Sequence, residues 1–114
     1  MKQKIPIKEA CIESIDQAIN AERNGADRIE LCKSLDLGGL TPEKRVLQNT
    51  IKSISIPIKV MIRPRPGNFI FSQNEIKIME QDIDLCKNSN VQEVVIGVLT
   101  MSGNIDTKVT NRLA

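Results

Sequence analysis

Two hydrophobic periodicities alternate along the chain, and they predict strands and helices in turn. Alternation with a period of two predicts strands at residues 5–11, 28–32, 58–63 and 94–99. Between these segments, and again after residue 106, apolar residues recur with helical spacing. A strand followed by a helix, repeated four times, predicts an α/β fold with a parallel sheet and helices packed on it.

Local signals mark where the predicted helices begin. Ser14 and Ser72 each precede a Gln or Glu by three residues, which has the form of a capping box. Thr41 and Pro42 have the types preferred at an N-cap and at the first helical position. The sequence Asn24-Gly25 predicts the end of the first helix.

Polar and sulfur-containing side chains recur on one face of the predicted strands. Strands of a parallel sheet are usually buried on both faces, so carboxylates and thiols within them need partners. In a parallel α/β barrel the carboxyl ends of the strands form the functional face. We expect the conspicuous residues to gather there: Glu9, Cys11, Glu30, Cys32, Met61, Arg63, Arg65 and Asp106.

Composition narrows the class of protein. The chain has 114 residues, of which 40% are hydrophobic and 26% charged, which indicates one globular domain. A net charge of +2 without a basic block, and two aromatic residues, give no support for nucleic-acid binding. Neither a signal-peptide h-region nor a membrane-length apolar run is present, and the three cysteines fit free thiols, so we expect a cytoplasmic protein without a membrane partner.

Several segments together resemble one protein family. The segments NGADRIELC, LGGLTP, VMIRPRPGNF and VVIGVLT, followed by GNID, are similar in order and spacing to the CutC copper homeostasis family. This resemblance implies a (β/α)8, or TIM, barrel. Because the family's chains are about twice as long, it also implies that residues 1–114 are the N-terminal half of such a barrel, a truncated domain that lacks strands 5–8.

The resemblance further implies a cytosolic protein that binds Cu(I) through cysteine thiols. Carried over by position, Cys32 is the first candidate ligand and Cys11 the second. Because adjacent strands lie close together, Met61 on the third predicted strand is a candidate for a third sulfur donor. Thiolate and thioether sulfur are soft ligands that select Cu(I). The alternative is that the cysteines are small buried hydrophobic residues, which applies most strongly to Cys86 in a predicted helix.

An enzyme is a competing interpretation. Glu9 and Glu30, faced by Arg63, would form an acid–base group, although the three side chains could equally compensate each other's charge in the interior. A small anionic ligand would be held by Arg63, Arg65 and the loop at Gly38 and Gly39. The sequence contains no histidine and indicates no substrate.

Half a barrel poses a problem of assembly. Four parallel strands leave two open edges and an uncovered inner face, so we expect exposed apolar surface. The chain would then form homo-oligomers or need a complementary C-terminal half. A non-functional remnant is the remaining interpretation.

Overall fold

Four short parallel strands form one sheet, in the order in which they occur in the chain. The computed structural model describes residues 5–114. The strands are β1 (Glu9–Ile12), β2 (Arg28–Leu31), β3 (Ile58–Met61) and β4 (Glu93–Val95), and the sheet order is β1-β2-β3-β4. All three strand pairs are parallel, which confirms the predicted α/β fold.

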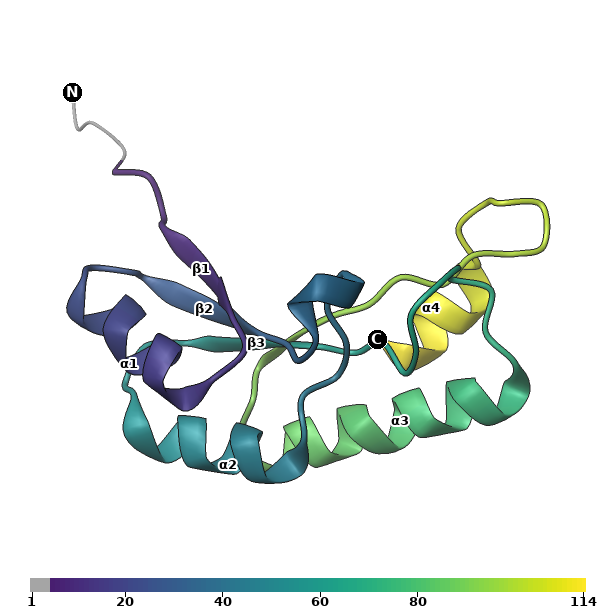
Figure 1. Ribbon diagram of the computed structural model, residues 1–114. Helices are drawn as coiled ribbons and strands as arrows, with labels where there is room; N and C mark the ends of the chain where they lie inside the picture. The colour runs from purple at the N-terminus through teal and green to yellow at the C-terminus, as the bar shows by residue number, and fades with distance from the viewer. Residues whose placement is uncertain (1–4) are drawn as a thin grey trace.

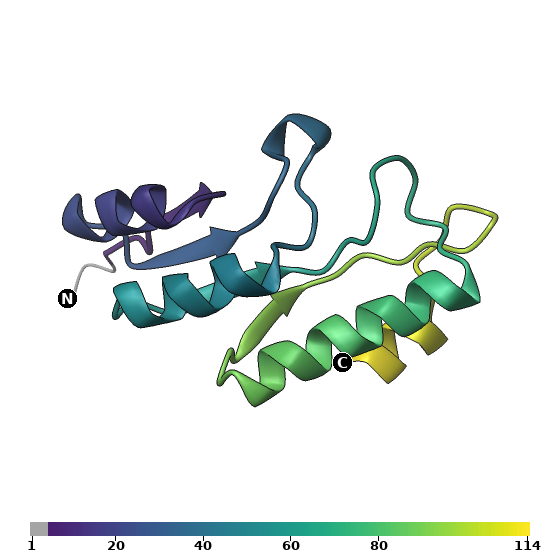
Figure 2. The same ribbon diagram turned by 60° about the horizontal axis from the view of Figure 1, so that its bottom comes forward.

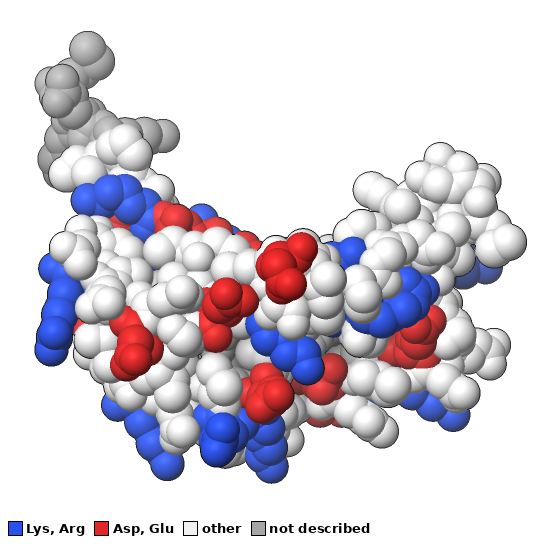
Figure 3. Space-filling view, viewed as in Figure 1, with Lys and Arg blue, Asp and Glu red and all other residues white. Residues whose placement is uncertain are grey.

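Helices follow the strands and cover one face of the sheet. They are α1 (Ile15–Arg23), α2 (Lys44–Ser53), α3 (Gln73–Asn88) and α4 (Thr107–Leu113), with a 3₁₀ turn η1 (Leu35–Leu37) after β2. Figures 1 and 2 show α1, α2 and α3 along the same side of the sheet, with α4 beside α3. Among residues 5–114 no α-helix lies on the opposite face, and the outline of the molecule is concave there (Figures 1 and 3).

The core lies between the sheet and these helices. Strand residues such as Ile29, Leu31 and Val60 are almost fully buried against helix residues such as Leu47 and Met79. Each large aliphatic side chain buried in this way contributes about 1.5–3 kcal/mol. The sheet is therefore held by its helical face, and the other face is free to carry polar groups.

The helix-free face is polar because strand alternation assigns it the charged and sulfur-containing residues. Across this face Cys11 lies opposite Glu30, Glu30 opposite Lys59, and Lys59 opposite Glu93. The apolar surface that we expected is exposed elsewhere, at Ile5, Ile7, Leu37, Phe69, Ile78, Met101 and Ile105. Figure 3 also shows basic and acidic groups interspersed over the face in view.

The strands are shorter than the sequence predicts. β1 begins at Glu9 rather than residue 5, and Ile5 and Ile7 before it are exposed. β4 covers Glu93–Val95 instead of residues 94–99, and β2 and β3 end before Cys32 and before residue 62. Alternation extends beyond the residues that find a partner strand, so the pattern alone overestimates strand length.

Two of the three predicted helix starts are confirmed. Ser72 forms a complete capping box with Glu75, and the Ser14 side chain accepts a hydrogen bond from the Gln17 N–H, although Gln17 reaches back to Glu13 instead of to Ser14. The prediction for Thr41 is wrong, because α2 begins at Lys44. The Thr41 hydroxyl instead accepts from the Arg63 N–H at 2.8 Å and donates to the Arg63 carbonyl at 3.1 Å, which joins two loops.

Candidate metal centre

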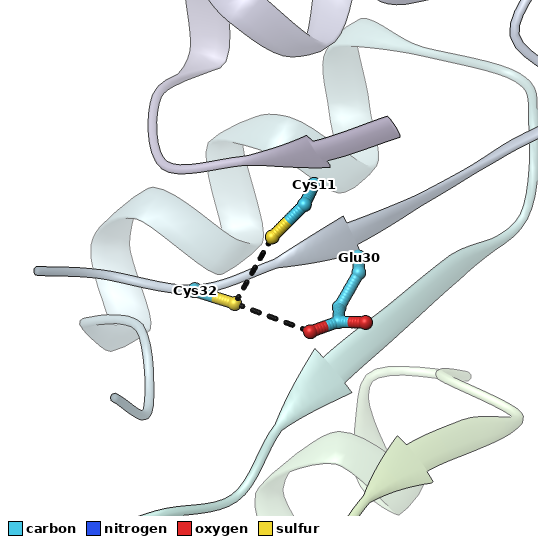
Figure 4. A group of neighbouring side chains, drawn as sticks. All are labelled: Cys11, Glu30 and Cys32. Atoms are coloured by element: carbon cyan, nitrogen blue, oxygen red, sulfur yellow. Dashed lines mark hydrogen bonds between the residues drawn. The ribbon is translucent and has the colours of Figure 1, made fainter. Parts of the chain in front are cut away.

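Two thiols and one carboxylate meet on the polar face of the sheet. Cys11 on β1 lies in register with Glu30 on β2, and Cys32 follows Glu30 by two residues, so all three side chains point to the same side. The Cys11 Sγ and Cys32 Sγ atoms are 3.9 Å apart, and the Cys32 thiol lies 3.6 Å from Glu30 Oε1 (Figure 4). Their ligand atoms all lie within 4.8 Å of one another. The structure thus brings together the two predicted thiol ligands.

The loop after β2 covers one of the two thiols. A two-residue antiparallel bridge between Lys33 and Leu40 folds this loop back on itself. Gly39 then comes so close that a Cβ atom there would lie 3.4 Å from Cys32 Sγ. Cys32 is consequently buried, with 1% exposure, while Cys11 is exposed on the open face.

Desolvation and the neighbouring groups favour the protonated form of both thiols. Desolvation is the main cause that raises the pKa of Cys32 far above its usual value, and the neighbouring Cys11 and Glu30 raise it further. The residue Cys11 is exposed, but partial desolvation of its thiol is the first cause that raises its pKa, although its contact with Cys32 acts in the opposite direction. Without a cation the pair is therefore neutral, and the Glu30 carboxylate is the nearby acceptor for the Cys32 proton.

A row of ion pairs lies next to the thiols, toward the amino ends of the strands. Glu9 is paired with Arg28 at 2.6 Å and with Lys59 at 3.2 Å, and Lys59 also lies 3.7 Å from Glu93. Burial alone would raise the pKa of Glu9, but hydrogen bonds from Lys59 and Arg28 outweigh it and hold this pKa below its usual value. The prediction that Glu9 lies at the carboxyl end of its strand is wrong, because β1 begins at this residue.

The predicted contact of Arg63 with two glutamates does not form. Its guanidinium donates to the carbonyls of Leu37, Gly39 and Gly67, at 3.3, 3.4 and 2.8 Å, and lies over the Phe69 ring. Among residues 5–114 it has no ion pair with a carboxylate, and its buried Nε has no hydrogen-bond partner. Arg63 and Glu9 therefore do not form the predicted acid–base group. The catalytic roles of Glu9, Glu30 and Arg63 remain predictions from the sequence.

The other residues of the predicted anion site have structural partners. Arg65 is paired with Glu75 at 2.6 Å and lies over the Phe71 ring. The N–H groups of Gly38 and Gly39 donate to the carbonyls of Leu35 and Ser34, so they are not directed at a ligand. Arg65, Gly38 and Gly39 thus build the loops, and only Arg63 keeps an unused donor.

The remaining predicted residues divide between core and periphery. Cys86 is buried in the core with 2% exposure, and burial raises its pKa to about 11. Met61 is half-buried on β3, and Asp106 caps α4 by accepting from the Val109 N–H. Sequence reasoning missed Lys59, although its period-two spacing from Met61 places it on the polar face. Within the described part of the chain, no helix is long and apolar enough to cross a membrane.

Comparisons with known proteins agree on one family. The model of the CutC family matches residues 6–114. A CutC family protein from Histophilus somni is 48% identical over 92% of this chain and 43% of its own, and the human copper homeostasis protein cutC homolog is 50% identical over 88% and 37%. A crystal structure of a CutC protein from Streptococcus agalactiae superposes with a TM-score of 0.88 at 33% identity, over 96% of this chain and 53% of the other. The chain therefore spans about two fifths of the length of these curated relatives.

Proposed function

The chain belongs to the CutC family, and from this premise we propose that it binds Cu(I) through Cys11 and Cys32 as part of copper homeostasis. Copper in this proposal is cargo that the protein takes up. The proposal extends to this chain the process that the name of its human relative states. The superposition of this chain on 53% of a CutC crystal structure supports the further proposal that residues 1–114 form the N-terminal half of a barrel domain that would hold this site.

The observation that carries the proposal is the 3.9 Å separation of the two sulfur atoms. A bond between a thiolate and a zinc ion is about 2.3 Å long. With bonds of that length, two sulfur atoms that share one metal ion lie at most about 4.6 Å apart. The two thiols therefore fit one ion without movement of the strands. A pair of soft sulfur donors favours Cu(I) over the hard cations that carboxylates bind.

Glu30 and the burial of Cys32 suit this role. Binding of a metal ion requires thiolates, so each thiol must lose its proton when the ion enters. Glu30 Oε1, which lies 3.6 Å from Cys32 Sγ, is placed to take the proton of the buried thiol. Cys11 is exposed on the open face, so an arriving ion would meet this thiol first.

The experiment is a competition for Cu(I) against a chromogenic chelator under reducing conditions. Loss of a residue that only supports a ligand weakens metal binding about 10–100-fold, so loss of a ligand should cost at least as much. We expect Cys32→Ser and Cys11→Ser to weaken binding by about tenfold or more. Cys86→Ser, which alters a buried thiol in the helical core, is the matched control and should bind as the wild type does. Unchanged binding in both Cys11→Ser and Cys32→Ser would refute the proposal.

Binding of a small anion at Arg63 is a second candidate function. One observation favours it: Arg63, a residue with 8% exposure, has no carboxylate partner among the described residues, and its buried Nε donor is unused. Burial of an uncompensated charge is costly, and a bound carboxylate or phosphate would supply the missing charge. Inorganic phosphate should then raise the melting temperature of the wild type and not of Arg63→Met. An equal rise in both proteins would exclude Arg63 as the site.

A further inference from the structure

Glu30 is a charged residue of the polar face without a partner of opposite charge. Within the described part of the chain it forms no ion pair, although Lys59 lies opposite it in register on β3. The Lys59 ammonium is instead shared by Glu9 and Glu93, at 3.2 and 3.7 Å. The half-buried Glu30 carboxylate accepts only from the Cys32 thiol among the described side chains. A cation bound there would supply the charge that the sheet does not.

The spacing of the two sulfur atoms fits a bent arrangement around an ion. With bonds of about 2.3 Å, sulfur atoms 3.9 Å apart form an angle of about 115° at the ion, whereas a linear arrangement needs a separation of about 4.6 Å. An angle of about 115° lies close to the tetrahedral value and leaves room for a further ligand. Cys11 and Cys32 therefore form two corners of a site that has more than two.

The Glu30 carboxylate lies where a third ligand belongs. A zinc ion is bound by thiolate sulfur at about 2.3 Å and by carboxylate oxygen at about 2.0–2.2 Å, so at a tetrahedral angle these two atoms lie about 3.5–3.7 Å apart. The Cys32 Sγ and Glu30 Oε1 atoms are 3.6 Å apart (Figure 4). The remaining distance, from Cys11 Sγ to the carboxylate, is at most 4.8 Å, and rotation of the Glu30 side chain shortens it.

We propose that this site also binds Zn²⁺, with Glu30 as the third protein ligand beside Cys11 and Cys32. The inference rests on the thiol pair of the proposed function and adds a second ion, together with the residue that selects it. Thiolate and carboxylate are both ligands of Zn²⁺, and a zinc site with three protein ligands keeps its fourth position open. The face beside the exposed Cys11 leaves that position accessible to solvent.

Charge at Glu30 distinguishes the two ions. Two thiolates around Cu(I) form a unit with one negative charge, which repels an ionised carboxylate, whereas two thiolates around Zn²⁺ form a neutral unit. Cys32 is buried, and buried charges are screened less than charges in water, so this difference is larger here than at an open surface. The Glu30 carboxylate therefore favours the divalent ion, and loss of its charge shifts the preference toward Cu(I).

Titrations of Glu30→Gln with zinc and with copper test the proposal. Glutamine keeps the shape of the side chain and removes its charge. In competition with a chromogenic chelator, and with a reductant that contains no thiol, Glu30→Gln should bind Zn²⁺ about tenfold more weakly than the wild type, or more weakly still. Its affinity for Cu(I), measured by the same kind of competition, should equal that of the wild type or exceed it, which also shows that the variant is folded.

Glu93→Gln is the matched control. Its carboxylate lies on the same face and pairs with Lys59, so the substitution removes one negative charge without altering the group of Cys11, Glu30 and Cys32. Its affinity for Zn²⁺ should therefore equal that of the wild type.

Co²⁺ supplies a second readout, because it replaces Zn²⁺ in many sites and its absorption spectrum reports the ligands. In the wild type we expect a charge-transfer band from thiolate to cobalt and the strong visible bands of a four-coordinate ion. Glu30→Gln should change the visible bands, and Cys32→Ser should weaken the charge-transfer band.

The results distinguish this inference from the proposed function. The inference is overturned if the wild type does not bind Zn²⁺, if Glu30→Gln and Glu93→Gln bind it equally well, or if Glu30→Gln loses affinity for both ions to the same extent. None of these results removes the dependence of Cu(I) binding on Cys11 and Cys32. Zinc binding that requires both thiols and Glu30, in a chain whose Cu(I) binding requires neither thiol, would instead support the inference and refute the proposed function.

Discussion

Replacement of Gly38 by alanine tests how tightly the loop after β2 is fitted to Arg63. Gly38 has a φ of +90°, and a Cβ atom there would lie 2.9 Å from Arg63 Nη1. This nitrogen donates to the carbonyls of Leu37 and Gly39, so the added methyl group must shift it relative to both acceptors. Phe69 on the face of the guanidinium limits where it can move.

Two costs add up, and a second glycine separates them. An alanine at positive φ costs about 1–3 kcal/mol in backbone strain. Gly103 has a φ of +84° with nothing within 4 Å of its position, so Gly103→Ala measures this strain alone. Hydrogen bonds from a charged group contribute about 1.5–3 kcal/mol, so Gly38→Ala should lower the free energy of unfolding by about that much more than Gly103→Ala does.

Urea denaturation, analysed by midpoint and slope, measures both values. The additional cost should vanish when Gly38→Ala is introduced into Arg63→Met, because the group that the methyl displaces is then gone. If Gly38→Ala and Gly103→Ala differ by less than about 0.5 kcal/mol, the contact between Gly38 and Arg63 does not constrain this loop.

Three further predictions follow from single contacts. Thr41→Val leaves the Arg63 N–H without its acceptor and should lower the free energy of unfolding, measured in urea, by about 1–3 kcal/mol. Thr41→Ser keeps the hydroxyl and should retain most of the stability. Equal losses in the two variants would exclude the hydrogen bond as the cause. The pKa of Glu9 is lowered in the fold, so its ion pairs stabilise the protein above the ordinary carboxyl pKa and are lost as the pH falls through the lower folded pKa. Between pH 7 and pH 3 the free energy of unfolding should therefore fall more in the wild type than in Glu9→Gln. Parallel losses in the two proteins would contradict this. Iodoacetamide at low protein concentration should modify the exposed Cys11 before the two buried cysteines. Because the pKa of Cys11 is raised, this reaction should be slower than the reaction of iodoacetamide with glutathione. Mass spectrometry of peptides shows the order of labelling, and early labelling of Cys32 would refute the prediction.

Local sequence signals predicted the elements well where a local contact decides them. The Ser72 capping box closes within four residues, and it forms as the sequence indicates. Thr41 has the same kind of signal, but its hydroxyl finds the backbone of Arg63, 22 residues away, and the helix begins three residues later. A cap competes with tertiary hydrogen bonds that a single sequence does not display.

The candidate site, too, was predicted correctly only where local features decide it. Alternation placed Cys11, Glu30 and Cys32 on one face correctly, because side chains of a strand alternate whatever its neighbours are. Alternation did not show at which end of its strand Glu9 lies, because this depends on where pairing with Arg28 begins. Nor did it show that carbonyls and an aromatic ring, rather than carboxylates, surround Arg63.

The sequential strand order has a consequence for how the chain folds. β2 pairs only with β1 and β3, the strands immediately before and after it, so each new β/α unit docks onto one that already exists. Each pairing spans a single helix-containing connection, so no strand has to wait for a strand farther along the chain before it can pair. At about 5–20 residues per second a ribosome releases these units one after another, so the sheet can grow by one strand at a time as the chain emerges. The thiol pair of Cys11 and Cys32 would be in place once the second strand has docked, well before the last helix leaves the ribosome.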